Sequence, residues 1–197
     1  MNSASLAISV AWCTWVGFAV AMRYYFRGAR QRNPAKTFLT LSAFVCTLMQ
    51  LVVLSLANPP SGWRLGFGLA FYGLANSVFW SALWVHGKAR PAFAFIDVKP
   101  SAFTRAGPYR VVRHPIYSAY LLGWLAGPLV TGQVWLLSTV AWMWLLYYVA
   151  ARQEEKHFSQ TSFRNDYDVY RKQAGMFLPR LIPTYRPSVD NPSRSAA

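Results

Sequence analysis

The chain has 197 residues, of which 54% are hydrophobic and only 13% are charged, and its formal net charge is +14. Because a soluble domain carries about a quarter charged residues, this composition argues against a water-soluble globule and favours one membrane-embedded domain. The basic residues flank apolar runs, where they would contact the anionic headgroups of a lipid bilayer, so their number does not indicate nucleic acid as a partner.

Five apolar runs follow one another along the chain. They cover residues 3–22, 38–57, 65–85, 116–130 and 134–151. The first three have the length of about 20 residues that crosses a hydrocarbon core of about 30 Å as a helix. The fourth covers only about 22 Å at about 1.5 Å per residue, and with the fifth it forms a helical hairpin that turns at Gly132. We therefore predict an all-α, polytopic membrane protein with about five transmembrane helices, the last two a hairpin; buried helices of a soluble protein are the alternative.

The loops between the runs differ in charge. A basic cluster follows the first run, whereas a secretory signal peptide carries its charge before the apolar segment, so we expect this run to be retained. The cluster consists of Arg23, Arg27, Arg30, Arg32 and Lys36. The positive-inside rule places residues 23–37 and 87–114 in the cytoplasm, and the short loop 58–64 outside. Five crossings then leave the N-terminus outside and the C-terminus in the cytoplasm, and we expect the bacterial inner membrane.

Residues 107–117, GPYRVVRHPIY, form a basic and aromatic elbow before the fourth run. Gly-Pro is a turn signal, Pro115 suits the first position of a helix, and His114 would then be its cap. The free N–H groups at this helix start, beside Arg113, could hold an anion. His114 and Tyr117 are three residues apart and share a helix face. Since Arg, His and Tyr also favour the membrane interface, a headgroup anchor is the alternative.

Glu154 and Glu155 follow the fifth run directly, in a chain that has only six acidic residues. The hairpin returns them to the side of the membrane that holds the elbow. A carboxylate beside a cationic helix start could bind a polar ligand that is partly cationic. The alternative is a salt bridge to Arg110, Arg152 or Lys156.

The tail after the fifth run mixes aromatic and charged residues. Residues 152–176 predict an interfacial amphipathic helix in the cytoplasm, which could fold over the elbow. Prolines at positions 179 and 183 end the helix, and the Pro- and Ser-rich residues 184–197 are expected to be disordered after a single domain of residues 1–183. The two cysteines lie inside apolar runs, so neither a disulfide framework nor a metal site is predicted.

At the elbow, the acidic pair and the tail, the chain resembles the integral-membrane methyltransferases that include isoprenylcysteine carboxyl methyltransferases and phospholipid N-methyltransferases. The family pattern is roughly L-V-x-x-G-x-Y-x-x-x-R-H-P-x-Y, a hairpin, E-E-x-x-L, F-G, Y-x-x-Y and R-L-I-P. The elbow matches at Gly107, Tyr109, Arg113, His114, Pro115 and Tyr117. The later matches are Glu154, Glu155, Phe158, Phe163, Tyr167, Tyr170 and residues 180–183. The resemblance covers residues 101–183.

The resemblance implies a methyltransferase that binds S-adenosylmethionine on the cytoplasmic side and acts on a lipid-like or apolar small molecule. The residues that it assigns to the cofactor are Phe103, Thr104, Tyr109, His114, Pro115, Ile116, Tyr117 and Glu154. The candidates for positioning in catalysis are Arg113, His114 and Glu155. A carboxylate or thiolate acceptor needs no general base, whereas an amine must lose its proton, for which His114 or a glutamate could serve.

The chain departs from the pattern at several positions. Prenylcysteine enzymes have an arginine four residues before the first glutamate, and this chain has Ala150 there. Arg152 is the remaining candidate for substrate binding, although it lies about 200° around a helix from that position. Ser101 and Arg164 replace the family's His and Gly. Two other classes remain open: an NADPH-dependent membrane reductase of the sterol type, which has a similar elbow, and a membrane protein without enzymatic activity.

Overall fold

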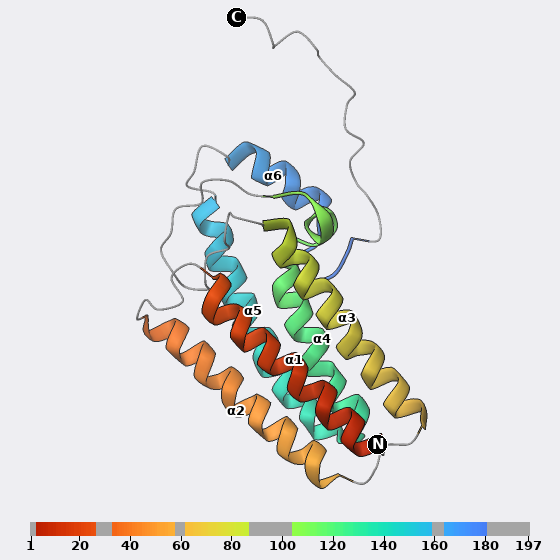
Figure 1. Cartoon of the computed structure of the whole chain (residues 1–197). Helices are drawn as coiled ribbons and strands as arrows, with labels where there is room; N and C mark the ends of the chain where they lie inside the picture. The colour runs from red at the N-terminus through yellow and green to blue at the C-terminus, as the bar shows by residue number, and fades with distance from the viewer. Residues whose placement is uncertain (1–2, 27–32, 58–61, 87–103, 159–163, 181–197) are drawn as a thin grey trace, which may run out of the picture.

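The computed structural model describes residues 3–26, 33–57, 62–86, 104–158 and 164–180, and within these ranges all regular structure is helical. The helices are α1 (Ser3–Tyr25), α2 (Pro34–Leu56), α3 (Gly62–His86), α4 (Pro115–Thr131), α5 (Leu137–Phe158) and α6 (Arg164–Gln173), with 3₁₀ turns η1 (Gly107–Arg110) and η2 (Val134–Leu136). Helices α1 to α5 run along one another in a bundle, and α6 lies across one end of it (Figure 1). The all-α prediction is confirmed for the described residues.

Four helical segments are long and apolar enough to cross a membrane: Ser3–Tyr25, Pro34–Leu56, Gly62–Val85 and Val134–Phe158. They contain four of the five predicted spans. The remaining predicted span, the fourth run at residues 116–130, lies in α4, which has only 17 residues and buries most of its side chains among the other helices. The four longer helices instead turn large apolar side chains outward, among them Trp12, Phe44, Phe67 and Leu145. By length and composition, four helices are thus candidate membrane spans, and α4 is the shorter, more buried helix among them.

Gly132 ends α4 as predicted. Its φ of 69° is left-handed, and its N–H donates to the Pro128 carbonyl at 2.8 Å. The left-handed backbone angle favours glycine here, and the guanidinium of Arg64 lies close over the turn. The turn sends α5 back along α4, which returns the chain to the end that it left.

Pro128 lies inside α4 and lacks an N–H, so the carbonyl of Trp124, four residues earlier, has no partner within the helix. Gln50 of α2 supplies that partner: its Nε2 donates to the Trp124 carbonyl at 3.1 Å and to Thr139 Oγ1 of α5 at 2.9 Å. Gln50 is only 2% exposed, and a side chain at Gly127 would collide with its amide oxygen. This amide links three helices inside the bundle.

Closely packed aromatic rings fill the bundle between the Gln50 amide and the end that carries α6. Phe18 of α1 lies 4.1 Å from Phe79 of α3, centroid to centroid, and both pack against Tyr120 of α4 at 5.4 and 5.7 Å. All three side chains are at most 5% exposed. This packing fixes the first turns of α4, where the elbow ends.

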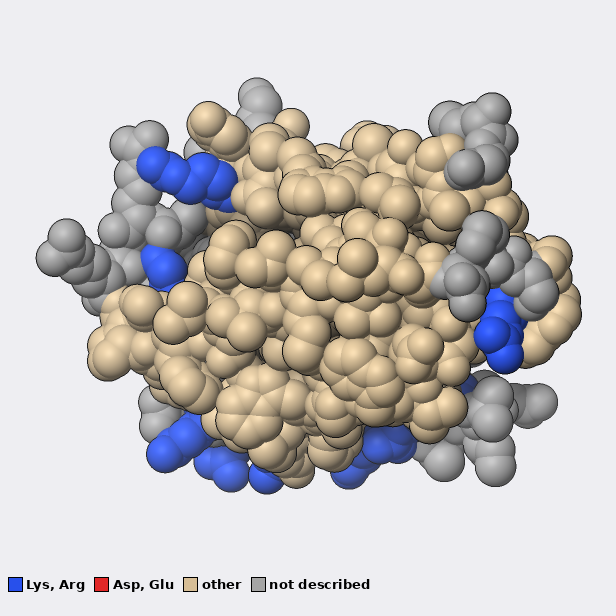
Figure 2. All heavy atoms as spheres, turned by 90° about the horizontal axis from the view of Figure 1, so that it is seen from below, with Lys and Arg blue, Asp and Glu red and all other residues tan. Residues whose placement is uncertain are grey.

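Charged side chains are distributed unevenly between the two ends of the bundle. In the end formed by the start of α1, the α2–α3 junction and the α4–α5 turn, the one Lys, Arg, Asp or Glu among the described residues is Arg64. Figure 2 looks along the bundle at this end: Lys and Arg show around the outline of the view, and no Asp or Glu is in view. The other described charges lie towards α6. This asymmetry agrees with the positive-inside pattern, while the orientation itself stays a prediction.

Candidate functional site

The elbow begins with the 3₁₀ turn η1. Gly107 has a φ of 54°, and a side chain there would collide with Val85 of α3, so the turn packs tightly against the end of that helix. Tyr109 is buried, and its carbonyl accepts a hydrogen bond from Tyr170 of α6 at 2.7 Å. The turn that Gly107-Pro108 predicts is therefore present, and the tail holds it in place.

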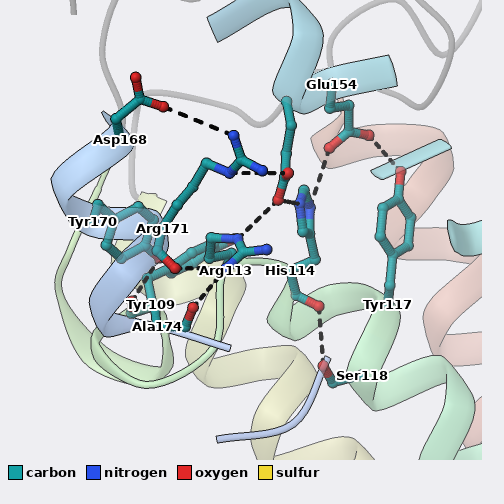
Figure 3. Close-up of polar contacts among 11 residues, drawn as sticks. Tyr109, Arg113, His114, Tyr117, Ser118, Glu154, Asp168, Tyr170, Arg171 and Ala174 are labelled. Carbon is teal, nitrogen blue, oxygen red and sulfur yellow. Dashed lines mark hydrogen bonds and ion pairs between the residues drawn. The ribbon is translucent and has the colours of Figure 1, made fainter. Parts of the chain in front are cut away.

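His114 and Pro115 occupy the cap and the first position of α4, as the sequence predicts. The imidazole, however, makes no capping bond to the helix. It lies between two carboxylates of α5, with Nε2 3.3 Å from Glu155 Oε1 and Nδ1 3.5 Å from Glu154 Oε2 (Figure 3). The hairpin thus brings the elbow and the acidic pair together, as expected.

The two glutamates lie within α5, because this helix continues beyond the predicted run to Phe158. Neighbouring side chains on a helix point about 100° apart, so the two carboxylates face different surroundings. Glu155 turns inward and is 5% exposed, whereas Glu154 is 33% exposed. Glu154 also accepts a hydrogen bond from the hydroxyl of Tyr117, one turn into α4. Glu154 is consequently the member of the pair that a ligand could reach.

Arg113 connects three parts of the chain. Its Nε donates to Glu155 Oε1 at 2.8 Å, and its Nη1 donates to the carbonyls of Arg171 and Ala174 at 3.1 and 2.6 Å. Arg171 of α6 approaches the other oxygen of Glu155 at 3.5 Å. Neither arginine is among the partners that the sequence predicts for the acidic pair, which were Arg110, Arg152 and Lys156.

The C-terminal segment runs directly over the elbow. Arg113 N–H donates to the Gly175 carbonyl at 2.8 Å, and Gly175 N–H donates to Val111 at 3.0 Å. His114 N–H donates to the Met176 carbonyl at 3.1 Å, and the Phe177 ring lies 6.2 Å from the imidazole. The tail therefore covers the elbow as predicted, but not as one helix over 152–176: α5 ends at Phe158, and α6 is a separate helix of 10 residues.

The remaining predicted cofactor residues surround this cluster at different depths. Pro115, Ile116 and Tyr117 are buried at the start of α4. Thr104 precedes the elbow, where its Oγ1 accepts the N–H of Ala106 at 3.3 Å. Arg152, the substrate candidate, is exposed on α5. Phe103 lies outside the described residues.

Besides Arg171, two further contributing residues, Tyr147 and Ser118, escaped the sequence analysis. Tyr147 of α5 stacks on Tyr117 with ring centroids 5.2 Å apart and planes 13° apart. It lies seven residues, about two helical turns, before Glu154, so helical periodicity places both on one face. Ser118 donates to the Phe177 carbonyl at 2.7 Å and thereby fixes the end of the tail. Phe177 is remote from Ser118 in sequence, so no local sequence pattern predicts this contact.

Burial and charge act in opposite directions on the imidazole. Burial of His114 lowers its pKa, but the hydrogen bonds and charges of Glu154 and Glu155 outweigh burial and raise that pKa above its usual value. The cluster thus combines cations, carboxylates, buried aromatic rings and a helix start within a small volume. Among the described residues, no group of three or more His, Cys, Asp or Glu could hold a metal ion.

Comparison with known proteins identifies the family. The family model for phospholipid methyltransferases matches residues 63–166, more than half of the chain, and the chain belongs to this family. It is 28% identical over 102 residues to the nickel-cobalt-cadmium resistance protein NccN of Alcaligenes xylosoxydans xylosoxydans, covering 52% of this chain and 43% of NccN. It is 29% identical over 117 residues to the cobalt-zinc-cadmium resistance protein CzcN of Cupriavidus metallidurans, covering 59% of this chain and 47% of CzcN. The chain thus spans less than half the length of both relatives. No solved structure matches.

Proposed function

We propose that the protein is a membrane-embedded methyltransferase that uses S-adenosylmethionine and acts on a lipid-like or apolar small molecule. The observation that carries this proposal is the meeting of His114 and Tyr117 with Glu154 and Glu155 at one end of the bundle. Membership of the phospholipid methyltransferase family supports it. We expect the site to lie on the cytoplasmic face, because the positive-inside rule predicts the excess of basic side chains there.

The residues present fit the charge pattern of the cofactor. Its methionyl group carries an ammonium and a carboxylate. Glu154, which is 33% exposed, offers a partner for the ammonium, and the positive start of α4 beside Arg113 offers one for the carboxylate. The buried rings of Tyr109 and Tyr117 supply aromatic surface. Phe103 and Thr104 stay in this proposal as candidates on the approach to the elbow, and Arg152 as the candidate for the acceptor.

When bound, the cofactor supplies an electrophilic methyl group on a sulfonium sulfur. The chain's own task is to align the acceptor with that methyl group and to keep water away. His114, Tyr117 and Glu155 are each less than a tenth exposed, so the inner side of the cluster is shielded from solvent. An acceptor with an apolar body would approach along the outward apolar faces of the helices.

The first experiment compares two ligands on detergent-purified protein by isothermal titration calorimetry. Saturable binding of S-adenosylhomocysteine without binding of NADPH supports the proposal. Binding of NADPH alone would refute it and favour the reductase. Incubation with methyl-labelled S-adenosylmethionine and host membrane extract then tests transfer: label in the lipid fraction is expected with the wild-type protein and not with heat-denatured protein.

A further inference from the structure

The surroundings of the His114 imidazole determine how many protons it can carry. Both ring nitrogens face carboxylate oxygens, Nδ1 at 3.5 Å from Glu154 and Nε2 at 3.3 Å from Glu155. A neutral imidazole has one N–H and one bare nitrogen, whereas an imidazolium has two N–H groups. In a neutral ring, a lone pair would point at a carboxylate in either tautomer. With both carboxylates ionised, only the doubly protonated ring satisfies both contacts.

We propose that His114 works as an imidazolium clamp that positions Glu154 and Glu155, and that it is not the general base of the reaction. This inference rests on the methyltransferase function proposed above and assigns a role within its site. His114 is thereby a positioning residue: it acts on a ligand through the carboxylate of Glu154.

The groups around the imidazole form an ordered series of charges. Arg113 holds Glu155, Glu155 holds His114, His114 holds Glu154, and Glu154 accepts the hydroxyl of Tyr117 (Figure 3). From α6, Arg171 approaches Glu155 at 3.5 Å. From the C-terminal segment, the uncharged ring of Phe177 faces the imidazole. Among the residues that the structure describes, the charged groups in contact with the imidazole are the two glutamates, and this favours the protonated ring.

The inner end of this series is anchored and its outer end is open. Arg113 is fixed by two carbonyls of the tail, and the side chains of Arg113, His114 and Glu155 are at most 9% exposed. Glu154 is the member that solvent reaches. The clamp thus fixes one accessible carboxylate against a rigid interior. The raised pKa of His114 agrees with this arrangement.

The clamp and a general base predict opposite responses to pH. A base must lose its proton to act, so rates that depend on it rise with pH. A clamp loses one N–H as pH rises, and the bare nitrogen then repels one carboxylate. Binding of a ligand that needs Glu154 should therefore weaken as pH rises through the pKa of His114.

The test measures S-adenosylhomocysteine binding by calorimetry between pH 6 and pH 9 in the wild-type protein, His114→Gln and the control His157→Gln. We expect the wild type and the control to lose at least about tenfold in affinity across this range, and His114→Gln to bind weakly with a flat profile. Because His114→Gln lacks the imidazole, its profile gives the contribution of the ligand's own titration, and His157→Gln controls for the loss of a histidine outside the cluster. An equal pH dependence in His114→Gln, or wild-type binding that strengthens with pH, would overturn the clamp.

A second measurement does not depend on ligand binding or on the folding of His114→Gln. The chain has three histidines. In a His86→Gln/His157→Gln variant, His114 is the remaining one, and ¹⁵N NMR reports whether both ring nitrogens are protonated at pH 7.5. Two protonated nitrogens support the clamp, and a neutral tautomer contradicts it. If S-adenosylhomocysteine binds at no pH, the proposed function fails, while the NMR result still decides the state of the ring.

Discussion

Arg113 offers a direct test of how the site is held together. Arg113→Ala removes the 2.8 Å bond to Glu155 and the two bonds to tail carbonyls at 3.1 and 2.6 Å. It also leaves Glu155, 5% exposed, without its shortest cationic partner. Breaking a buried ion pair by removing one partner costs about 3–5 kcal/mol. For a chain of this length, that corresponds to a fall in melting temperature of roughly 6–20 °C.

The assay is thermal unfolding in detergent, with limited proteolysis of the C-terminal segment as a second readout. Arg110→Ala is the matched control, because Arg110 is an exposed arginine of the same elbow and should change stability by no more than about 0.5 kcal/mol. Arg113→Lys keeps the charge but loses the planar fork, so it should fall between the two. If Arg113→Ala has the same melting temperature as Arg110→Ala, and its C-terminal segment is cleaved no faster, the described network does not stabilise the site.

Three further predictions concern other contacts. Gln50→Leu leaves the Trp124 carbonyl unpaired inside the bundle and should destabilise the protein by about 1 kcal/mol in a thermal melt, with exposed Gln153→Leu as the neutral control; equal melts would contradict the proposed role of the amide. Because the pKa of His114 is raised in the folded state, its contribution to stability is complete below about pH 6.5 and is lost as pH rises through that raised pKa; a melting profile between pH 6 and 9 that is identical in His114→Gln would disprove this. Tyr117→Phe removes the hydroxyl bonded to Glu154 but keeps the stacking on Tyr147, so S-adenosylhomocysteine should bind up to about tenfold more weakly at nearly unchanged stability; unchanged affinity would contradict the role of the hydroxyl.

The sequence predicted the features that depend on short stretches of chain. The apolar runs give the helices of the bundle, Gly132 gives the turn of the hairpin, and Pro115 with His114 gives the start of α4. The prediction that the hairpin returns Glu154 to the elbow is also confirmed, because a hairpin must bring its two ends together.

Features that depend on remote partners were not predicted. Gln50 lies in an apolar run, and its role follows only from Pro128. This proline leaves the Trp124 carbonyl without a helix bond, and Trp124 is 74 residues from Gln50 in the sequence. Arg171 lies in a tail of mixed charge, where spacing cannot show which cation turns towards Glu155. The tail also forms two helices rather than one, and the buried cluster of Tyr167 and Tyr170 on α6 packs against Phe158 at the end of α5, a contact that the amphipathic pattern does not predict.

The most direct measurement of the central claim compares the affinity of two variants, Glu154→Gln and Asp168→Asn, for S-adenosylhomocysteine. Each variant removes one carboxylate near the same end of the bundle, but Glu154 belongs to the cluster around His114, whereas Asp168 is exposed on α6. A site formed by the elbow and the acidic pair predicts at least about tenfold weaker binding for Glu154→Gln and wild-type binding for Asp168→Asn. Equal affinity in the two variants would contradict it.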